Sequence, residues 1–287
     1  MSFIKDLYHF LNPKFQNLFL EYPVDMKPIY GHGKPAHKTL NAIISSRDEI
    51  YRKHLKSVSK YTDALHNIEE DAKKDDAKKP GWNNGYLPGL DIVAIYTLLG
   101  ELKPKKYIEV GSGTSTKVAR KAKDDLKLDM EIVSIDPNPR QEIGAVADTI
   151  IKKPFENTDY KEVLNLEAGD VLFIDNSHRI LPNSDGMVFY MEILPFLKKG
   201  VIVHIHDIYL PYDYPQFMCD RFYSEQYGLA INLMANPKRY QTIFPCYYIS
   251  ENKSLASELN YFWKHPNLNT VEKHGGSFWL EIGTEPI

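Results

Sequence analysis

Short apolar runs alternate with helical segments after Trp82, and this alternation constrains the fold more than any other feature of the sequence. Such a pattern is typical of a parallel sheet whose strands are joined by crossover helices. The runs that fit strands are 106–110, 131–135, 148–151, 171–174, 201–205, 242–249 and 277–282. The sequence therefore predicts an α/β fold: a doubly wound, Rossmann-like mixed sheet of seven strands with helices on both faces.

Helices are expected around these strands at 90–99, 117–128 and 189–197. In the second of them the apolar residues fall on one face of a helix. The third leads into the sequence LKKG, which predicts a helix C-terminus with Gly200 at the C′ position.

The first eighty residues lack strand alternation and predict a helical extension. Apolar residues at helical spacing indicate one long amphipathic helix from Lys38 to Glu70. They are Leu40, Ile44, Tyr51, Leu55, Val58, Leu65 and Ile68. This helix either packs on the main domain or joins two copies in a homo-oligomer. The mixed charges of 69–79 predict a solvated helix end or linker, so we expect an extension over 1–80 and a second domain over 81–287.

Composition excludes several classes of partner. Lys and Arg number 35 against 38 Asp and Glu, so the chain has no global positive field for nucleic acid. Two cysteines are too few for a disulfide framework. Neither an uninterrupted apolar leader nor an apolar run long enough for a membrane span is present, so we expect a cytoplasmic protein with no membrane partner.

A glycine loop follows the first long strand, in the sequence YIEVGSGTSTKVAR (107–120). Gly111 and Gly113 allow close approach of backbone to a ligand. No Gly-Lys-Ser/Thr follows, which excludes a P-loop, and Thr116 stands where a dinucleotide fingerprint needs its third glycine. Glu109 would repel a diphosphate at this turn and suits a cation. An adenosyl cofactor with an ammonium and a sulfonium fits better than NAD.

Asp136 ends the second strand, where an acid can accept hydrogen bonds from both ribose hydroxyls. Two structural interpretations stay open. Glu109 could cap the adjacent helix, and Asp136 could start an Asp-Pro turn.

With these residues, 84–282 resembles the class I S-adenosylmethionine-dependent methyltransferases, and within them the methyltransferase-24-like group. Glu109, Gly111 and Gly113 are similar to the first motif of that family, and Asp136 matches its second-strand acid. The resemblance implies that Ser112 and Ser115 line the methionine end of the cofactor. It also implies that the stretch around Phe155 and Glu156 approaches the adenine.

A second group of chemical residues follows two later strands. Asp175 and His178 come after 171–174, and His206 and Asp207 come after 201–205. The carboxyl ends of such strands are where ligands bind, so we expect the four side chains to converge and Asp175 to lie near the cofactor. An imidazole, from His178 or His206, can remove the proton of a hydroxyl that receives a methyl group. Structural roles, such as a loop cap or a turn, are the alternative.

Asp175, His206 and Asp207 together offer two carboxylates and one imidazole for a divalent metal, a set that suits Mn²⁺ or Fe²⁺ better than Mg²⁺. The Asp-x-x-His of Asp175 and His178 resembles that of metal-dependent sugar O-methyltransferases, which implies a metal ligand and a general base. Their second pair is acidic, whereas one acid is His206 here.

The sequence thus predicts an O-methyltransferase acting on a hydroxyl of a small molecule or saccharide. A metal-dependent hydroxylase or hydrolase on the same fold, and a nucleoside-binding module without catalysis, are the alternatives.

Three further segments bear on the site. His204 lies inside a strand and is expected in the core. The aromatic stretch 209–228 predicts a lid that brings Tyr209, Tyr212 and Tyr214 near the substrate, although packing or a dimer contact explains it equally well. His32 and His37 are expected at the surface.

Overall fold

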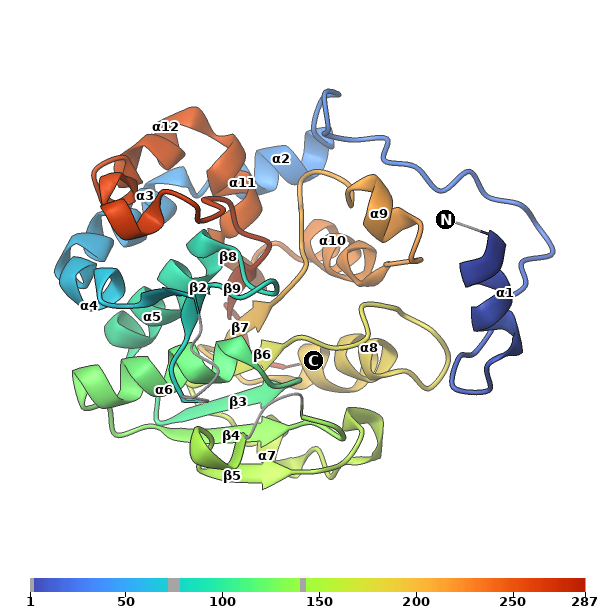
Figure 1. Cartoon of the computed structure of the whole chain (residues 1–287), viewed down its shortest axis with the longest axis horizontal. Coiled ribbons are helices and arrows are strands. Elements are labelled where there is room, and N and C mark those ends of the chain that lie inside the picture. The colour runs from blue at the N-terminus through green and yellow to red at the C-terminus, as the bar shows by residue number, and fades with distance from the viewer. Residues whose placement is uncertain (1–2, 72–77, 140–142, 287) are drawn as a thin grey trace.

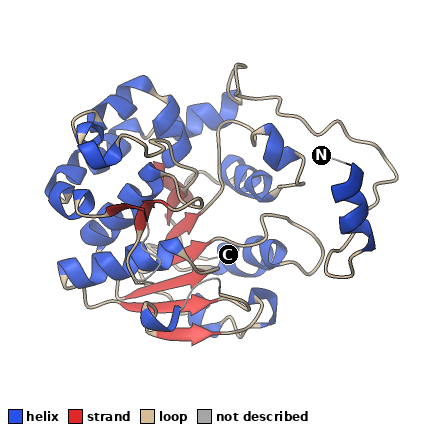
Figure 2. Ribbon diagram, in the orientation of Figure 1, coloured by secondary structure: helices blue, strands red, loops and turns tan. Residues whose placement is uncertain are grey.

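The computed structural model describes residues 3–71, 78–139 and 143–286. Its centre is a seven-stranded sheet with the strand order β5-β4-β3-β6-β7-β9-β8 (Figure 1). The strands are β3 (Lys106–Val110), β4 (Glu131–Ile135), β5 (Thr149–Ile151), β6 (Val171–Ile174), β7 (Ile202–Ile205), β8 (Tyr240–Pro245) and β9 (Phe278–Ile282). The five neighbouring strands β5, β4, β3, β6 and β7 run parallel to one another, and β9 is antiparallel to both its neighbours, β7 and β8. Helices flank this sheet (Figure 2), which confirms the predicted fold class.

The longer helices are α1 (Phe3–Leu11), α2 (Lys38–Ser45), α3 (Asp48–Ser57), α5 (Gly89–Leu102), α6 (Thr114–Leu126) and α10 (Glu225–Ala235). Short helices are α4 (Thr62–His66), α7 (Lys161–Leu164), α8 (Asp185–Val188), α9 (Gln216–Cys219), α11 (Cys246–Glu251) and α12 (Lys253–Ala256). A separate parallel pair joins β1 (Glu69–Asp71) to β2 (Gly81–Asn83). None of the helices in the described ranges is long and apolar enough to cross a membrane.

The register of the sheet brings four loops to one edge. Val110, the last residue of β3, pairs with Ile135 of β4 and with Ile174 of β6, and Ile174 pairs with Ile205 of β7. These strands are buried along almost their whole length, as expected for parallel strands covered on both faces. The segments that follow the four strands therefore start side by side, at the carboxyl edge of the sheet.

The helix predicted from Lys38 to Glu70 is interrupted, so this prediction is wrong in detail. α2 ends at Ser45, where the hydroxyl of Ser46 donates to the backbone carbonyl of Ile43 and competes with the helical pattern. Arg47 then donates to the carbonyl of Thr242 in β8 (2.6 Å), which ties the start of α3 to the edge of the sheet. All the predicted stripe residues are buried in the main core. Whether the chain forms an oligomer stays a prediction.

Three other boundaries differ from the prediction. Glu69–Asp71 pairs as strand β1 instead of ending a helix, while 72–77 lies outside the described residues. β8 ends at Pro245, and the apolar residues that follow form α11. The helix expected over 189–197 continues from α8 as a π segment, η4 (Phe189–Ile193), and a 3-10 turn, η5 (Leu194–Phe196).

Pro195 explains that irregularity, because proline lacks an N–H and its ring clashes with the preceding helical turn. The helical segment ends at Phe196, and Gly200 (φ +86°) lies in a turn beyond it, not at the C′ position.

Candidate functional site

A cavity of about 1180 Å³ opens at the carboxyl edge of β3, β4, β6 and β7. Of the predicted site residues, it is lined by Gly111, Ser112, Asp136, Asp175, His178, His206 and Asp207. Phe155 and Glu156 line it as well. The two groups of residues that sequence motifs singled out thus share one cavity.

The glycine loop is tightly packed at Gly111. Its φ of +81° is one that side-chain-bearing residues rarely adopt, and a Cβ on it would lie 2.1 Å from the backbone oxygen of Asp175. The backbone N–H of Asp175 donates to the carbonyl of Val110 (2.9 Å), which holds the loops after β3 and β6 together. Only glycine fits this position, so the turn brings backbone directly against the cavity.

Glu109 does not line the cavity, and its contact with the cofactor stays a prediction. Its side chain is fully buried and accepts hydrogen bonds from the hydroxyls of Ser115 (2.9 Å) and Thr116. Burial raises the pKa of Glu109 to about 8, against the lowering effect of the Thr116 and Ser115 hydroxyls. Ser115 is buried with it and does not reach the cavity either. These hydroxyl contacts fasten the start of α6 to β3.

Asp136 lies at the cavity wall and shapes the same loop from the other side. One carboxylate oxygen accepts from the backbone N–H (3.0 Å) and the hydroxyl (2.7 Å) of Ser112, and the other accepts from the backbone N–H of Asn138 (2.7 Å). The last of these bonds is the turn contact that the alternative interpretation of Asp136 expected. Its contact with a ribose stays a prediction. Gly113 donates its N–H to the hydroxyl of Thr116 (3.0 Å) and lies outside the cavity lining.

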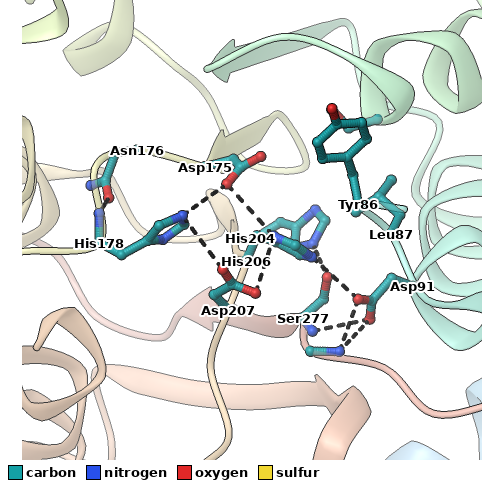
Figure 3. A network of polar contacts seen from close by, with 12 residues as sticks. Tyr86, Leu87, Asp91, Asp175, Asn176, His178, His204, His206, Asp207 and Ser277 are labelled. Atoms are coloured by element: carbon teal, nitrogen blue, oxygen red, sulfur yellow. Dashed lines mark hydrogen bonds and ion pairs between the residues drawn. The ribbon is translucent and has the colours of Figure 1, made fainter. Parts of the chain in front are cut away.

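The four polar residues after β6 and β7 converge, as predicted (Figure 3). Nε2 of His178 lies 3.5 Å from a carboxylate oxygen of Asp175 and 3.5 Å from one of Asp207. Nδ1 of His206 lies 3.6 Å from each of the same two side chains. The backbones of His178 (φ +62°) and Asp207 (φ +54°) are in the left-handed region, which is uncommon for such residues and recurs at functional sites.

Two buried carboxylates, which the sequence motifs did not identify, lie behind these imidazoles. Glu225 Oε1 is 2.5 Å from Nδ1 of His178, and Asp91 Oδ2 is 3.5 Å from Nε2 of His206. Glu225 and Asp91 each stand in the first turn of a helix, α10 and α5. Acids are common there because they complement the helix dipole, so the sequence carried no sign of a second role.

Carboxylates surround both imidazoles and raise their pKa values. Burial alone lowers the pKa of His178, but Glu225, Asp175 and Asp207 together hold it above the usual histidine value. For His206 the same balance, with Asp207, Asp175 and Asp91, raises the pKa well above that value despite burial. A proton held on either imidazole is therefore stabilised by charge.

His204 lies in the core, as expected. Its ring is fully buried and stacked between Phe173 (4.2 Å between ring centroids) and Trp279 (4.0 Å). Burial lowers its pKa well below the usual histidine value. It does not line the cavity, and its Nε2 contacts the hydroxyl of Ser277 (2.7 Å; Figure 3).

The aromatic segment contributes one of the three expected tyrosines to the cavity. Tyr209 lines the cavity, whereas Tyr212 and Tyr214 do not. Tyr223, from the same segment, stacks on His178 with 4.6 Å between ring centroids. His32 also lines the cavity and is exposed, which agrees with its expected surface location. His37 instead caps α2 by accepting from the backbone N–H of Leu40.

Within 3–71, 78–139 and 143–286, no group of three or more His, Cys, Asp or Glu side chains is arranged as a preformed metal site. Asp175, His206 and Asp207 lie close together, but a metal ion bound by them stays a proposal.

Residues 108–208 match a family model described as a methyltransferase domain, Methyltransf_24. The central segment is similar to a methyltransferase domain. Glu109, Asp136, Asp175, His178 and the His206-Asp207 pair all lie inside the matched segment. No curated protein matches the chain.

Solved structures of methyltransferases resemble the chain at low identity. One is the SAH-bound methyltransferase PaMTH1 of Podospora anserina (17% identity, 74% of this chain and 93% of that chain covered, TM-score 0.39). Others are a putative methyltransferase of Thermobifida fusca (14%, 67% and 79%, 0.41) and a putative O-methyltransferase of Klebsiella pneumoniae (10%, 86% and 96%, 0.37). TM-scores this low carry no argument about substrate or mechanism.

Proposed function

We propose that this chain is an S-adenosylmethionine-dependent methyltransferase that methylates a hydroxyl group of a small molecule or saccharide, with His178 as the general base. One observation carries the proposal. A single cavity contains the glycine loop and Asp136 at one side and the His178 cluster at the other. The family-model match over the same segment supports it.

The charge of the cavity favours a cationic cofactor over a dinucleotide. Acidic side chains that line it are Asp136, Glu156, Asp175, Asp185, Asp207, Glu251 and Glu272, whereas Arg221 is the one arginine or lysine in the described lining. Such a lining repels a diphosphate and attracts a sulfonium and an ammonium. In this proposal Asp136 contacts the ribose, and Asp175, whose carboxylate is partly exposed beside Gly111, faces the positive end of the cofactor.

The methyl group moves to an acceptor oxygen that has lost its proton. S-adenosylmethionine supplies the electrophilic methyl group. The residues around His178 hold the acceptor hydroxyl within reach of Nε2, and positioning of this kind accounts for much of the acceleration in such reactions. His178 Nε2 takes the hydroxyl proton, and the carboxylates of Asp175, Asp207 and Glu225 stabilise the imidazolium that forms.

The proposal includes a divalent metal ion at the same cluster, which the comparisons do not test. Two carboxylates and an imidazole, from Asp175, Asp207 and His206, would hold it, and their chemistry suits Mn²⁺ or Fe²⁺. Such an ion lowers the pKa of a coordinated hydroxyl. Activity that disappears on exhaustive chelation and returns with Mn²⁺ supports the metal, whereas activity that survives chelation leaves His178 as the unaided base.

Calorimetric titration with S-adenosylhomocysteine tests the cofactor. We expect saturable one-site binding to the wild-type chain, and no binding at millimolar concentration would remove the proposal. A methyl-transfer screen against nucleotide sugars and glycans, read by mass spectrometry, tests the acceptor. Binding without transfer to any acceptor would favour a nucleoside-binding module instead.

A further inference from the structure

Each imidazole of the cluster has one nitrogen toward the cavity side and the other toward a buried carboxylate. Glu225 is 1% exposed and Asp91 is fully buried. They come from different helices, α10 and α5, far apart in the sequence. The inference starts from the shorter of the two contacts, between Glu225 and His178.

His178 is held in one tautomer by Glu225. A carboxylate accepts hydrogen bonds and donates none, so the 2.5 Å contact places the ring proton on Nδ1. In the neutral ring Nε2 then carries the lone pair. That nitrogen is the one between Asp175 and Asp207, where the proposed base must act.

His206 shows the reverse arrangement. Its Nε2 is buried without a hydrogen-bond partner in the described part of the chain, and the closest acid is Asp91 at 3.5 Å. Asp91 is fixed in place, because it accepts from the backbone N–H groups of Gly276 (2.8 Å) and Ser277 (3.0 Å). The contact of Nε2 with Asp91 is longer than a hydrogen bond and Nδ1 lies 3.6 Å from both Asp175 and Asp207, so no contact of this length fixes the ring proton of His206.

We propose that Glu225 is a positioning residue that fixes the tautomer of His178 so that its Nε2 faces the reaction. This inference rests on the proposed function. The contact of Asp91 with His206 is 1.0 Å longer and is no hydrogen bond, so the inference is limited to Glu225.

The hydrogen bonding of Glu225 argues against a purely structural role. Its second oxygen, Oε2, is buried without a hydrogen-bond partner among the described residues. Burial of a carboxylate is costly unless its oxygens are satisfied. The buried structural carboxylate Glu109 accepts hydrogen bonds through both oxygens, whereas Glu225 is bonded through the oxygen that faces His178.

A matched control exists elsewhere in the chain. Glu101 contacts Nδ1 of His54 at 2.6 Å, with both side chains 16% exposed, and neither residue lines the cavity. The E101Q variant breaks the same kind of pair away from the site. It separates the general effect of losing a Glu–His contact from the effect on the reaction.

The experiment compares E225Q with E101Q in the full chain. Because a glutamine amide can donate to Nδ1, we expect E225Q to move the ring proton of His178 to Nε2, seen by ¹⁵N NMR of labelled histidine. We expect kcat to fall about 10- to 100-fold, the size typical for loss of such a supporting partner, with KM for the acceptor and the affinity for S-adenosylhomocysteine within about twofold of wild type. E101Q should leave kcat unchanged.

A wild-type kcat together with an unchanged tautomer in E225Q would overturn the inference. If E225Q does not fold, E225D replaces it: a shorter carboxylate should keep the wild-type tautomer and recover part of kcat, and a shifted tautomer would contradict the inference. The NMR readout needs no turnover. Failure of the proposed function would therefore appear as absent methyl transfer by wild type, independently of the tautomer result.

Discussion

The carboxylates near the ends of β3 and β4 have other partners than those after β6 and β7. Glu109, in β3, and Asp136, directly after β4, accept hydrogen bonds of 2.7 to 3.0 Å from hydroxyl and backbone donors of the segments beside them. Beyond the ends of β6 and β7, carboxylate oxygens of Asp175 and Asp207 lie 3.5 to 3.6 Å from imidazole nitrogens of His178 and His206. The first distances are ordinary hydrogen bonds, and the second are longer than hydrogen bonds.

Under the proposed function, this difference divides the sheet edge into a side for binding and a side for chemistry. The β3–β4 side is built before any ligand arrives, because its acids fix the glycine loop in one shape. The β6–β7 side keeps two carboxylates and two imidazoles close together, with charge contacts that a ligand can replace. Substitutions on the first side should therefore change binding or stability, and those on the second should change turnover.

The largest effect is expected for His178→Ala. Removal of a general base costs about 10²- to 10⁴-fold in rate, so kcat should fall by at least about 100-fold in initial-rate measurements. The affinity for S-adenosylhomocysteine should stay within about twofold, because the glycine loop is untouched. Full turnover by this variant would dismiss His178 as the base and would contradict a catalytic role for the β6–β7 side.

Glu109→Gln should change how stability depends on pH. The pKa of Glu109 is raised by burial to about 8 in the folded state, whereas an exposed glutamate ionises near its usual value. The unfolded chain therefore loses this proton first, so the contribution is complete below about pH 4 and is lost as pH rises toward 8.

Denaturant unfolding at several pH values checks this prediction. Relative to E109Q, the free energy of unfolding of the wild-type chain should fall by about 3 kcal/mol between pH 5 and 8. Parallel pH profiles for the two proteins would show that Glu109 does not hold a proton in the folded state.

Asp136→Ala should weaken the binding of S-adenosylhomocysteine about 10- to 100-fold by calorimetry. Loss of a charged hydrogen-bonding group costs about 1.5 to 3 kcal/mol, and here the variant also frees the loop at Ser112. Asp129→Ala is the control, since that carboxylate is 94% exposed at the opposite end of β4. Equal affinity for both variants would refute the ribose role of Asp136.

Ser112→Ala should have the smallest effect. It removes the hydroxyl contact to Asp136 (2.7 Å) but keeps the backbone N–H contact (3.0 Å), so about 1 kcal/mol of binding free energy is at stake. We expect an approximately fivefold weaker affinity in the same titration. An effect as large as that of Asp136→Ala would mean that the hydroxyl itself contacts the cofactor.

The sheet could be predicted from sequence because its parallel strands are buried on both faces. Strands β3, β4 and β6 begin and end at the predicted residues. The strand predicted over 242–249 runs past the end of β8 at Pro245. The residues after Pro245 form a short apolar run, and such a run is compatible with a strand and with a helix.

The site could be predicted only where a motif stands at a strand end. Asp175 and His178 converge with His206 because the strand register places them side by side. Glu225 and Asp91 could not be found, since their roles depend on contacts between helices and strands far apart in the chain. The orientation of Glu109 was also out of reach, because sequence does not show whether an acid before a glycine turn faces the ligand or the helix behind it.

A crystal structure with S-adenosylhomocysteine bound tests the central claim most directly. The account predicts the adenosine beside Asp136 and Phe155, and the sulfur turned toward Asp175 and His178 in the same cavity. A ligand bound elsewhere, or bound here with its sulfur turned away from His178, would contradict the account.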